Sequence, residues 1–185
     1  MESSSTIYTF EIDSANVISA VSDNWDAFAL ENEGEEACAG RVLGRPWWEF
    51  VTGNEVRMLY TGLLRRVRET KLQLTLPFRC DGPTVRRYMT MTVAPRPDDA
   101  VLFSCALVRE EPRKLVPLLS REAPRASFAL GLCGWCGKAR VDGVWMEVEE
   151  MLRKLKLFER EQVPTLSHGI CPACEAKFSQ LAGLS

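Results

Sequence analysis

Residues 72–93 read LQLTLPFRCDGPTVRRYMTMTV, and their pattern decides the fold of the N-terminal part of the chain. Apolar and polar side chains alternate from Leu72 to Phe78 and again from Val85 to Val93, the period-two pattern of strands with one buried face. Asp81-Gly82-Pro83 between the two runs is a turn signal. A third alternating run, from Val101 to Leu107, follows a second turn. The sequence therefore predicts an antiparallel meander of three strands.

The residues before this meander predict one long helix and two short elements. Residues Glu55 to Glu69 carry apolar side chains three or four positions apart, which share one helical face. Val17 to Val21 is interpreted as a short strand. Trp25 to Leu30 is interpreted as a second short strand or as the start of a helix. Two elements, a helical middle and three meander strands indicate an α+β fold.

This order of elements resembles the PAS domain, a sensor fold with a five-stranded antiparallel sheet and helices packed on one face. The resemblance covers about residues 12–109. Asn16 to Trp25 is similar to the family's first hairpin, and Val42-Leu43-Gly44-Arg45-Pro46-Trp47 to its turn before a short helix. Residues 78–87 also look like a form of the domain seen in bacterial signalling proteins. The resemblance implies either a bound small molecule between sheet and helices or dimerisation through the sheet, and the fold alone does not choose.

Aromatic and methionine side chains of this segment are candidates for the lining of a ligand pocket, and filling of the core is the alternative. They are Trp25, Trp47, Trp48, Phe50, Tyr60, Phe78, Met89, Met91 and Phe103. A haem would need a cysteine ligand from Cys38, Cys80 or Cys105, which are more simply interpreted as small buried side chains. The chain lacks the Asn-Cys-Arg-Phe-like motif of flavin photoreceptors, which disfavours light sensing by that route.

Two Cys-x-x-Cys pairs near the C-terminus predict a metal site made of Cys133, Cys136, Cys171 and Cys174. Each pair places two sulfur atoms on one side of a tight loop, and two facing loops give the tetrahedral thiolate set that suits Zn²⁺. Iron binds the same ligands and stays an alternative. A thioredoxin-like redox pair is disfavoured because no βαβ unit surrounds either motif. Four cysteines close the site, so the metal is expected to be structural.

His168 precedes Cys171 by three residues and is an alternative ligand, although four cysteines already suffice. The run from Ser167 to Cys174 is similar to an "SHGiCpxC" element of bacterial sensor and response-regulator proteins. There it pairs with an upstream "CxWCxk" element, which Cys133 to Lys138 matches. This resemblance covers about residues 131–178.

The insert between the two pairs predicts a helix from Val144 to Phe158, because apolar residues recur there at helical spacing. They are Trp145, Val148, Met151, Leu152 and Leu155.

The chain of 185 residues is thereby divided into a PAS-like sensor domain (1–109), a proline-bearing linker (110–127) and a zinc-binding module (128–185). Lys and Arg number 23 against 25 Asp and Glu, so net charge gives no reason to expect tight nucleic-acid binding. No apolar run could span a membrane and no signal pattern opens the chain, which indicates a cytoplasmic protein.

The function expected from these features is that of a bacterial signalling protein that forms a homodimer and contacts a protein partner. The linker is expected to let the zinc module move, and the module to present Trp135, Trp145 and a helix face around Glu147, Glu150 and Lys154. A zinc-module regulator that binds nucleic acid is the alternative. An enzyme is less favoured, because the metal site is closed and no nucleophile–base signature is present.

Overall fold

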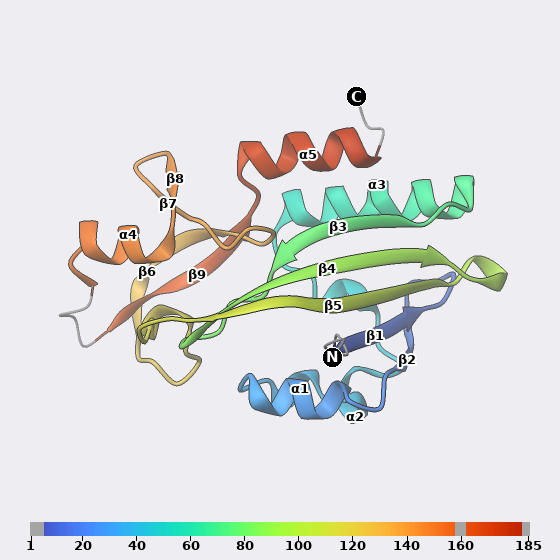
Figure 1. The fold of residues 1–185 in the computed structure, drawn as a ribbon, viewed down its shortest axis with the longest axis horizontal. Helices are drawn as coiled ribbons and strands as arrows, with labels where there is room; N and C mark the ends of the chain where they lie inside the picture. The colour runs from blue at the N-terminus through green and yellow to red at the C-terminus, as the bar shows by residue number, and fades with distance from the viewer. Residues whose placement is uncertain (1–5, 158–161, 183–185) are drawn as a thin grey trace.

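The computed structural model describes residues 6–157 and 162–182 of the chain. Its N-terminal part is a five-stranded antiparallel sheet with helices (Figure 1). The strand order is β2-β1-β5-β4-β3. The sheet consists of β1 (Ile7–Ile12), β2 (Ile18–Val21), β3 (Leu74–Arg79), β4 (Val85–Pro95) and β5 (Val101–Pro112). The mixed α+β class and the meander of the last three strands are confirmed.

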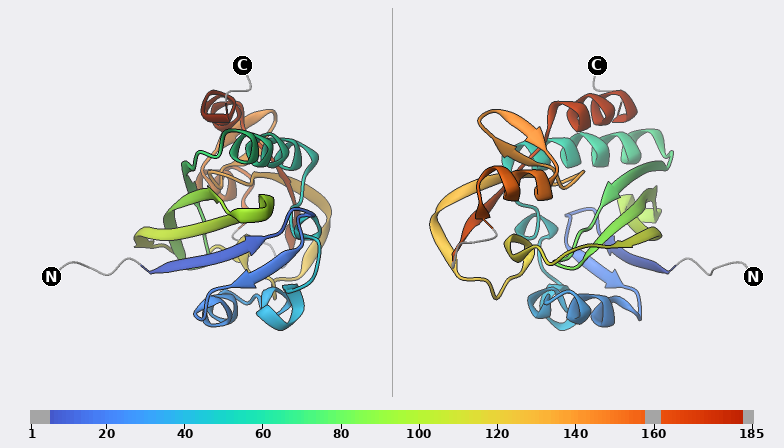
Figure 2. Two further views of the ribbon diagram at one scale, coloured as in Figure 1. Left: turned by 90° about the vertical axis from the view of Figure 1, so that its right-hand side faces the viewer. Right: turned by 60° about the vertical axis from the view of Figure 1, so that its left-hand side comes forward.

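Figure 2 shows the helices of this part on two sides of the sheet, with the long helix above it and the short helices below it. The long helix α3 (Asn54–Thr70) buries Leu63 and Val67 against Val93 and Phe103 of the sheet. The shorter elements are α1 (Trp25–Glu31), α2 (Ala39–Val42) and the 3₁₀ turns η1 (Glu35–Ala37), η2 (Trp47–Glu49), η3 (Pro97–Asp99) and η4 (Pro117–Leu119).

The structure differs from the sequence-based expectation at two places in the first thirty residues. The interpretation of Trp25 to Leu30 as a strand is wrong, and its helical alternative is confirmed by α1. The strand that the sequence analysis missed is β1, which pairs with both β2 and β5. Its inner-face residues Tyr8, Phe10 and Ile12 alternate as a half-buried strand requires.

The C-terminal part forms a second sheet of four short strands in the order β8-β7-β6-β9. The strands are β6 (Arg125–Cys133), β7 (Ala139–Val141), β8 (Val144–Met146) and β9 (Val163–Gly169), followed by α5 (Pro172–Ala182). The predicted helix from Val144 is wrong in its first part, because Asp142 and Gly143 make a tight hairpin turn at φ 50° and 81°. The helix α4 runs only from Val148 to Lys154, and Phe158 lies outside the described residues.

The segment expected to be a linker has regular structure along much of its length. Strand β5 continues to Pro112, and β6 begins at Arg125. Between them, the Arg113 N–H donates to the Thr84 carbonyl at 2.9 Å, and the Val116 N–H donates to the Pro83 carbonyl at 2.8 Å. These bonds fasten the segment to the β3–β4 turn, contrary to the expected independent positioning of the two parts.

The buried side chains form two cores, and their division does not follow the predicted domain limits. The first core joins the five-stranded sheet and α3 to Cys133, Trp135, Cys171, Cys174 and Phe178. The second core lies between η4, the four-stranded sheet and α4. The cysteine loops therefore pack with the larger sheet, although they belong in sequence to the smaller one.

Among the described residues, no helix is both long enough and apolar enough to cross a membrane.

Candidate metal centre

The structure brings the four predicted cysteines together. The Sγ atoms of Cys133, Cys136, Cys171 and Cys174 all lie within 4.8 Å of one another. The Cys136 and Cys171 sulfur atoms are 3.7 Å apart. A tetrahedral ion with metal–sulfur bonds of about 2.3 Å separates its ligands by about 3.8 Å. The cluster could therefore hold one metal ion with small adjustments of the side chains.

Each pair of cysteines stands on a tight backbone turn. Cys133 ends β6, and its N–H donates to the Lys138 carbonyl at 2.8 Å, which closes the first loop. Gly137 in this loop has a φ of 70°, where a side chain would be strained. In the second loop the Cys174 N–H donates to the Cys171 carbonyl at 2.9 Å as α5 begins.

Parallel pairing of β6 with β9 places the two loops face to face. Cys133 stands opposite Gly169 in this ladder, and the Gly134 N–H donates to the Gly169 carbonyl at 3.0 Å. Because the two strands run in the same direction, they end at the same edge of the sheet, and the two cysteine turns that follow them lie side by side. The spacing within each pair was readable from the sequence, whereas this strand pairing was not.

Hydrogen bonds concentrate negative charge on Cys133. The hydrogen bond from the Cys136 thiol is the main cause that lowers the pKa of Cys133 to about 4. Burial acts in the opposite direction, and the backbone amides of Cys136, Cys171 and Trp135 lower the pKa further. The Cys171 N–H lies 3.4 Å from the Cys133 sulfur. Backbone donors of this kind are the usual means by which a protein stabilises clustered thiolates around a cation.

His168 stands outside the cluster. It lies on β9 opposite Leu132, its side chain is exposed, and the group of potential metal ligands is made of the four cysteines. Its backbone instead contacts the start of α3, because a Cβ atom built on Gly53 would lie 2.3 Å from the His168 carbonyl oxygen. Gly53 has a φ of 89°, so glycine is required there for both reasons. The first turn of α3 thus packs against the strand that leads into the second cysteine loop.

Trp135 is the second link between the cysteine loops and the larger sheet. Its side chain is 9% exposed, so the expectation that the module presents Trp135 to a partner is wrong. The indole N–H donates to the Pro77 carbonyl at 2.7 Å, and the Arg79 N–H donates to the Trp135 carbonyl at 2.9 Å. The ring packs edge-on against Phe178 at 4.6 Å and lies 5.9 Å from Tyr60 of α3.

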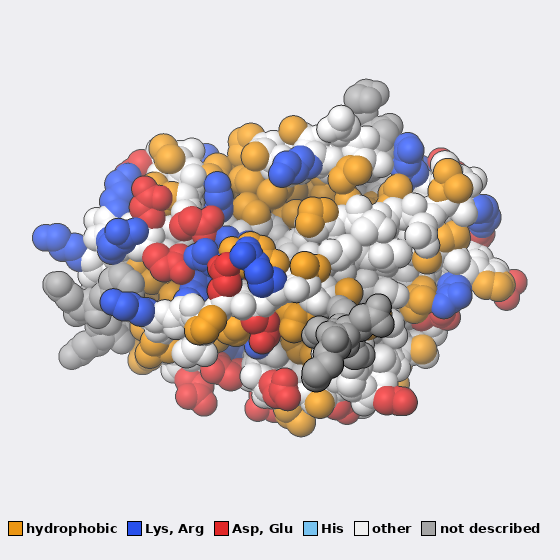
Figure 3. Space-filling view, viewed as in Figure 1, with side chains coloured by type: hydrophobic (Ala, Val, Ile, Leu, Met, Phe, Trp, Pro, Cys, Tyr) orange, Lys and Arg blue, Asp and Glu red, His pale blue; other side chains and the backbone are white. Residues whose placement is uncertain are grey.

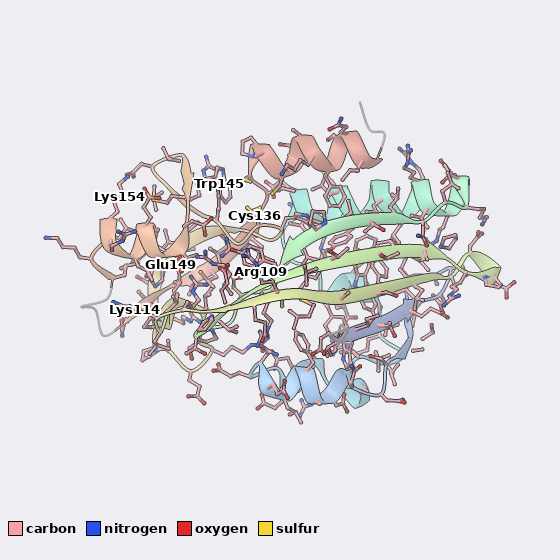
Figure 4. All side chains as sticks on the ribbon, in the orientation of Figure 1. Arg109, Lys114, Cys136, Trp145, Glu149 and Lys154 are labelled. Atoms are coloured by element: carbon pink, nitrogen blue, oxygen red, sulfur yellow. The ribbon has the colours of Figure 1, made fainter. Side chains whose placement is uncertain are left out.

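A network of charged side chains makes a third link, between α4 and the β3–β4 turn. Arg113 pairs with Asp81 at 2.9 Å and with Glu149 at 2.7 Å, and its side chain is only 5% exposed. Arg79 pairs with Asp81 and, at 2.8 Å, with Glu147. Although burial alone would lower it, the hydrogen bonds to these two acids raise the pKa of Arg79. Figure 4 shows Glu149 on the side of α4 that faces β4 and β5, whereas Lys154 points outward.

This network changes the role expected of the α4 surface. Glu147 is committed to Arg79 and Arg86 inside the molecule, and Lys154 pairs with Asp142 at 3.1 Å. Of the three positions expected to contact a partner, Glu150 alone is exposed and has no ion pair among the described residues. No sequence pattern signals the network, because its paired members lie up to 68 positions apart.

The candidates for a PAS-like ligand pocket mostly fill the first core. Trp47 lies 5.1 Å from Phe103 and 4.9 Å from Tyr60, ring centre to ring centre. Burial raises the pKa of Tyr60, which keeps its hydroxyl neutral. Met89 and Met91 are buried as well. These contacts favour core filling over a cavity at these positions.

The remaining candidates lie at the edges of the core. The Trp25 indole N–H donates to the Ala37 carbonyl at 2.7 Å, and Phe50 is half-buried beside the core. Trp48 borders a surface hollow beside α3, and Phe78 lines a groove next to the cysteines. Cys38, Cys80 and Cys105 are free thiols outside the metal cluster.

The chain matches no protein-family model and no curated protein.

Proposed function

We propose that the protein is a signalling or regulatory module, in which a PAS-like domain and a structural zinc centre form one rigid body that contacts another protein. The observation that carries this proposal is the position of the four cysteines in the core of the larger sheet. A metal there holds Trp135 and Phe178 against α3, and so fixes the relative position of the two sheets. The ion that fits best is zinc, because four thiolates in tetrahedral reach are its preferred structural ligands.

A structural role for the metal agrees with the surroundings of the cluster. Three of its four cysteines are no more than 7% exposed, and four thiolates leave no open position for a catalytic water. The zinc would therefore supply folding free energy rather than chemistry.

The PAS-like domain is proposed to act by association, as a homodimer through the outer face of its sheet. Its central positions are small and uncharged: Thr90 stands beside Ala106, and Thr92 beside Ser104. In Figure 3 the part of the surface over these strands carries few charged side chains. A patch with few charged side chains can be covered by a second copy at little cost of desolvation.

The proposal is tested by elemental analysis and light scattering of the purified protein. We expect about one zinc ion per chain and a particle twice the chain mass of 20.8 kDa. Thr92→Arg should give a monomer that keeps its zinc, whereas the matched change Thr61→Arg on the exposed side of α3 should leave the dimer intact. A metal-free protein, or a wild-type monomer at micromolar concentration, would contradict the respective part of the proposal.

Contact with a protein partner is proposed at the exposed side of α4 around Glu150. Glu150→Lys should then weaken capture of the partner, while Glu55→Lys on α3 should not. Equal capture by both variants would place the contact elsewhere.

A further inference from the structure

A groove opens beside the cluster of four cysteines. The groove lies between β3 and α5 and has a volume of about 370 Å³. Phe78, Trp135 and Phe178 line it, and it reaches Cys136 and Cys174. Figure 3 shows hydrophobic side chains gathered below α5 at this place.

The four cysteines are not equally accessible. Cys133, Cys171 and Cys174 are 2%, 3% and 7% exposed, whereas Cys136 is only partly buried. In Figure 4, Cys136 lies between the β7–β8 hairpin and α5, at the boundary of the two sheets. Of the two cysteines that line the groove, Cys136 is therefore the more exposed.

Two cations border the groove. Lys177 and Arg79 both line it, and because Arg79 is paired with Asp81 and Glu147, Lys177 supplies most of the positive charge there. Reactive cysteines in proteins stand in such partly exposed, electropositive surroundings. Cys105 and Cys80 do not line the groove, and burial raises the pKa of both.

We propose that Cys136 is a site of oxidation by hydrogen peroxide, and that its oxidation releases the metal. This inference rests on the zinc centre proposed above. The Cys136 thiolate attacks one oxygen of the peroxide, the O–O bond breaks, and hydroxide leaves, which gives a sulfenic acid. The Cys171 thiolate, whose sulfur lies 3.7 Å away, then attacks the Cys136 sulfur, and a second hydroxide leaves as the disulfide forms. Two thiolates lose two electrons in total, and one peroxide accepts them.

The disulfide has a structural consequence beyond the loss of two ligands. Cys171 and Trp135 belong to the first core, so any shift of their loops disturbs the packing against α3. Oxidation at the groove would thereby loosen the contact between the cysteine loops and the larger sheet. The oxidant would be the signal, and the loosened contact beside the groove would be the structural response.

The test uses the full chain loaded with zinc and treated with hydrogen peroxide. Zinc release is followed with a coloured chelator, and a sulfenic-acid trap followed by peptide mass spectrometry locates the modified cysteine. We expect the first adduct on Cys136, and a Cys136–Cys171 disulfide when the trap is left out. First modification of another cysteine during zinc release would overturn the proposal.

Two ligand exchanges provide the matched comparison, because three cysteines and one histidine also bind zinc. Cys136→His should release zinc several-fold more slowly than wild type, whereas Cys174→His, in the same groove, should react as fast as wild type. Equal rates for wild type and Cys136→His would overturn the proposal, and the adduct map of the wild type decides if a variant fails to fold. Zinc-loaded protein that resists peroxide contradicts this inference alone. Protein that binds no zinc contradicts the proposed function with it.

Discussion

The two hydrophobic cores are closed in different ways. The second core takes its buried residues from one stretch of chain, Val116 to Val163. The first core takes them from almost the whole chain, Ile12 to Phe178, and includes three of the four clustered cysteines. A metal bound to these cysteines, as proposed above, would therefore close the larger core rather than hold a separate small module. Loss of the metal should open the sheet domain at the edge where Trp135 enters it.

The largest effect is expected from removal of one metal ligand. Cys174→Ser should abolish stoichiometric metal binding and lower the free energy of unfolding by more than about 4 kcal/mol, since loss of a structural metal is among the most severe single changes. The shared core predicts one unfolding transition for both sheets. The sequence alone predicts that residues 1–109 stay folded. Denaturant titration followed by circular dichroism and tryptophan fluorescence decides between the two.

The control for this change is Cys38→Ser, which alters a half-buried cysteine outside the cluster. It should keep the metal and lose less than about 1 kcal/mol of stability. Two separate transitions in Cys174→Ser would show that the cores are independent.

Truncation of Trp135 should rank next. Trp135→Ala removes a buried ring from between Tyr60, Phe78 and Phe178, and should cost about 4 kcal/mol. Trp145→Ala, at a half-buried site, should cost clearly less. The two are compared by thermal unfolding of zinc-loaded protein. Equal losses would mean that Trp135 does not link the cysteine loops to the larger sheet.

Asp81→Asn tests the ionic contact between the two parts. Asp81 is 7% exposed and pairs with both Arg79 and Arg113, so its neutralisation leaves buried cations without a full partner. The expected cost is about 3 kcal/mol. Glu49→Gln, which removes the exposed pair with Arg45, should cost less than about 1 kcal/mol. A small loss in Asp81→Asn would indicate that the network is dispensable and that the apolar contact alone joins the two parts.

The smallest effect concerns Glu149 and depends on pH. Burial alone would raise its pKa, but backbone hydrogen bonding and the charges of Arg113 and Arg86 lower the pKa of Glu149 below its ordinary value of 4.5. A lowered pKa in the folded state stabilises the protein above pH 4.5, and this contribution disappears as the pH falls through the folded-state value.

The free energy of unfolding of wild type and Glu149→Gln should therefore differ by a constant amount above pH 4.5, and by less at lower pH. Protonation of the cysteines affects both proteins equally, so the difference isolates Glu149. A difference that does not change with falling pH would contradict this assignment.

Much of the fold was predictable because its signals are local. The alternation at Leu74 to Val93 and the helical spacing at Val56 to Val67 directly report which face of each element is buried. The proximity of the cysteines within each pair was predictable for the same reason, since each Cys-x-x-Cys pair is one turn of chain.

The errors arose where local pattern and tertiary structure disagree. The apolar residues from Trp145 to Leu155 fit a helix, yet the Asp142–Gly143 turn forces the first of them into a hairpin. Proline content suggested a free linker, whereas hydrogen bonds to Pro83 and Thr84 hold it. The burial of Trp135 and the pairing of Arg79 with Glu147 depend on contacts between distant parts of the chain, which one sequence does not display.

Hydrogen exchange of the full chain before and after chelation of its metal tests the central claim most directly. The account predicts one zinc ion per chain, and chelation should speed exchange both in the cysteine loops (133–138 and 169–174) and along α3 and the inner strands β4 and β5. Faster exchange confined to residues 128–182, with α3 unchanged, would contradict the claim that the metal centre closes the core of the larger sheet.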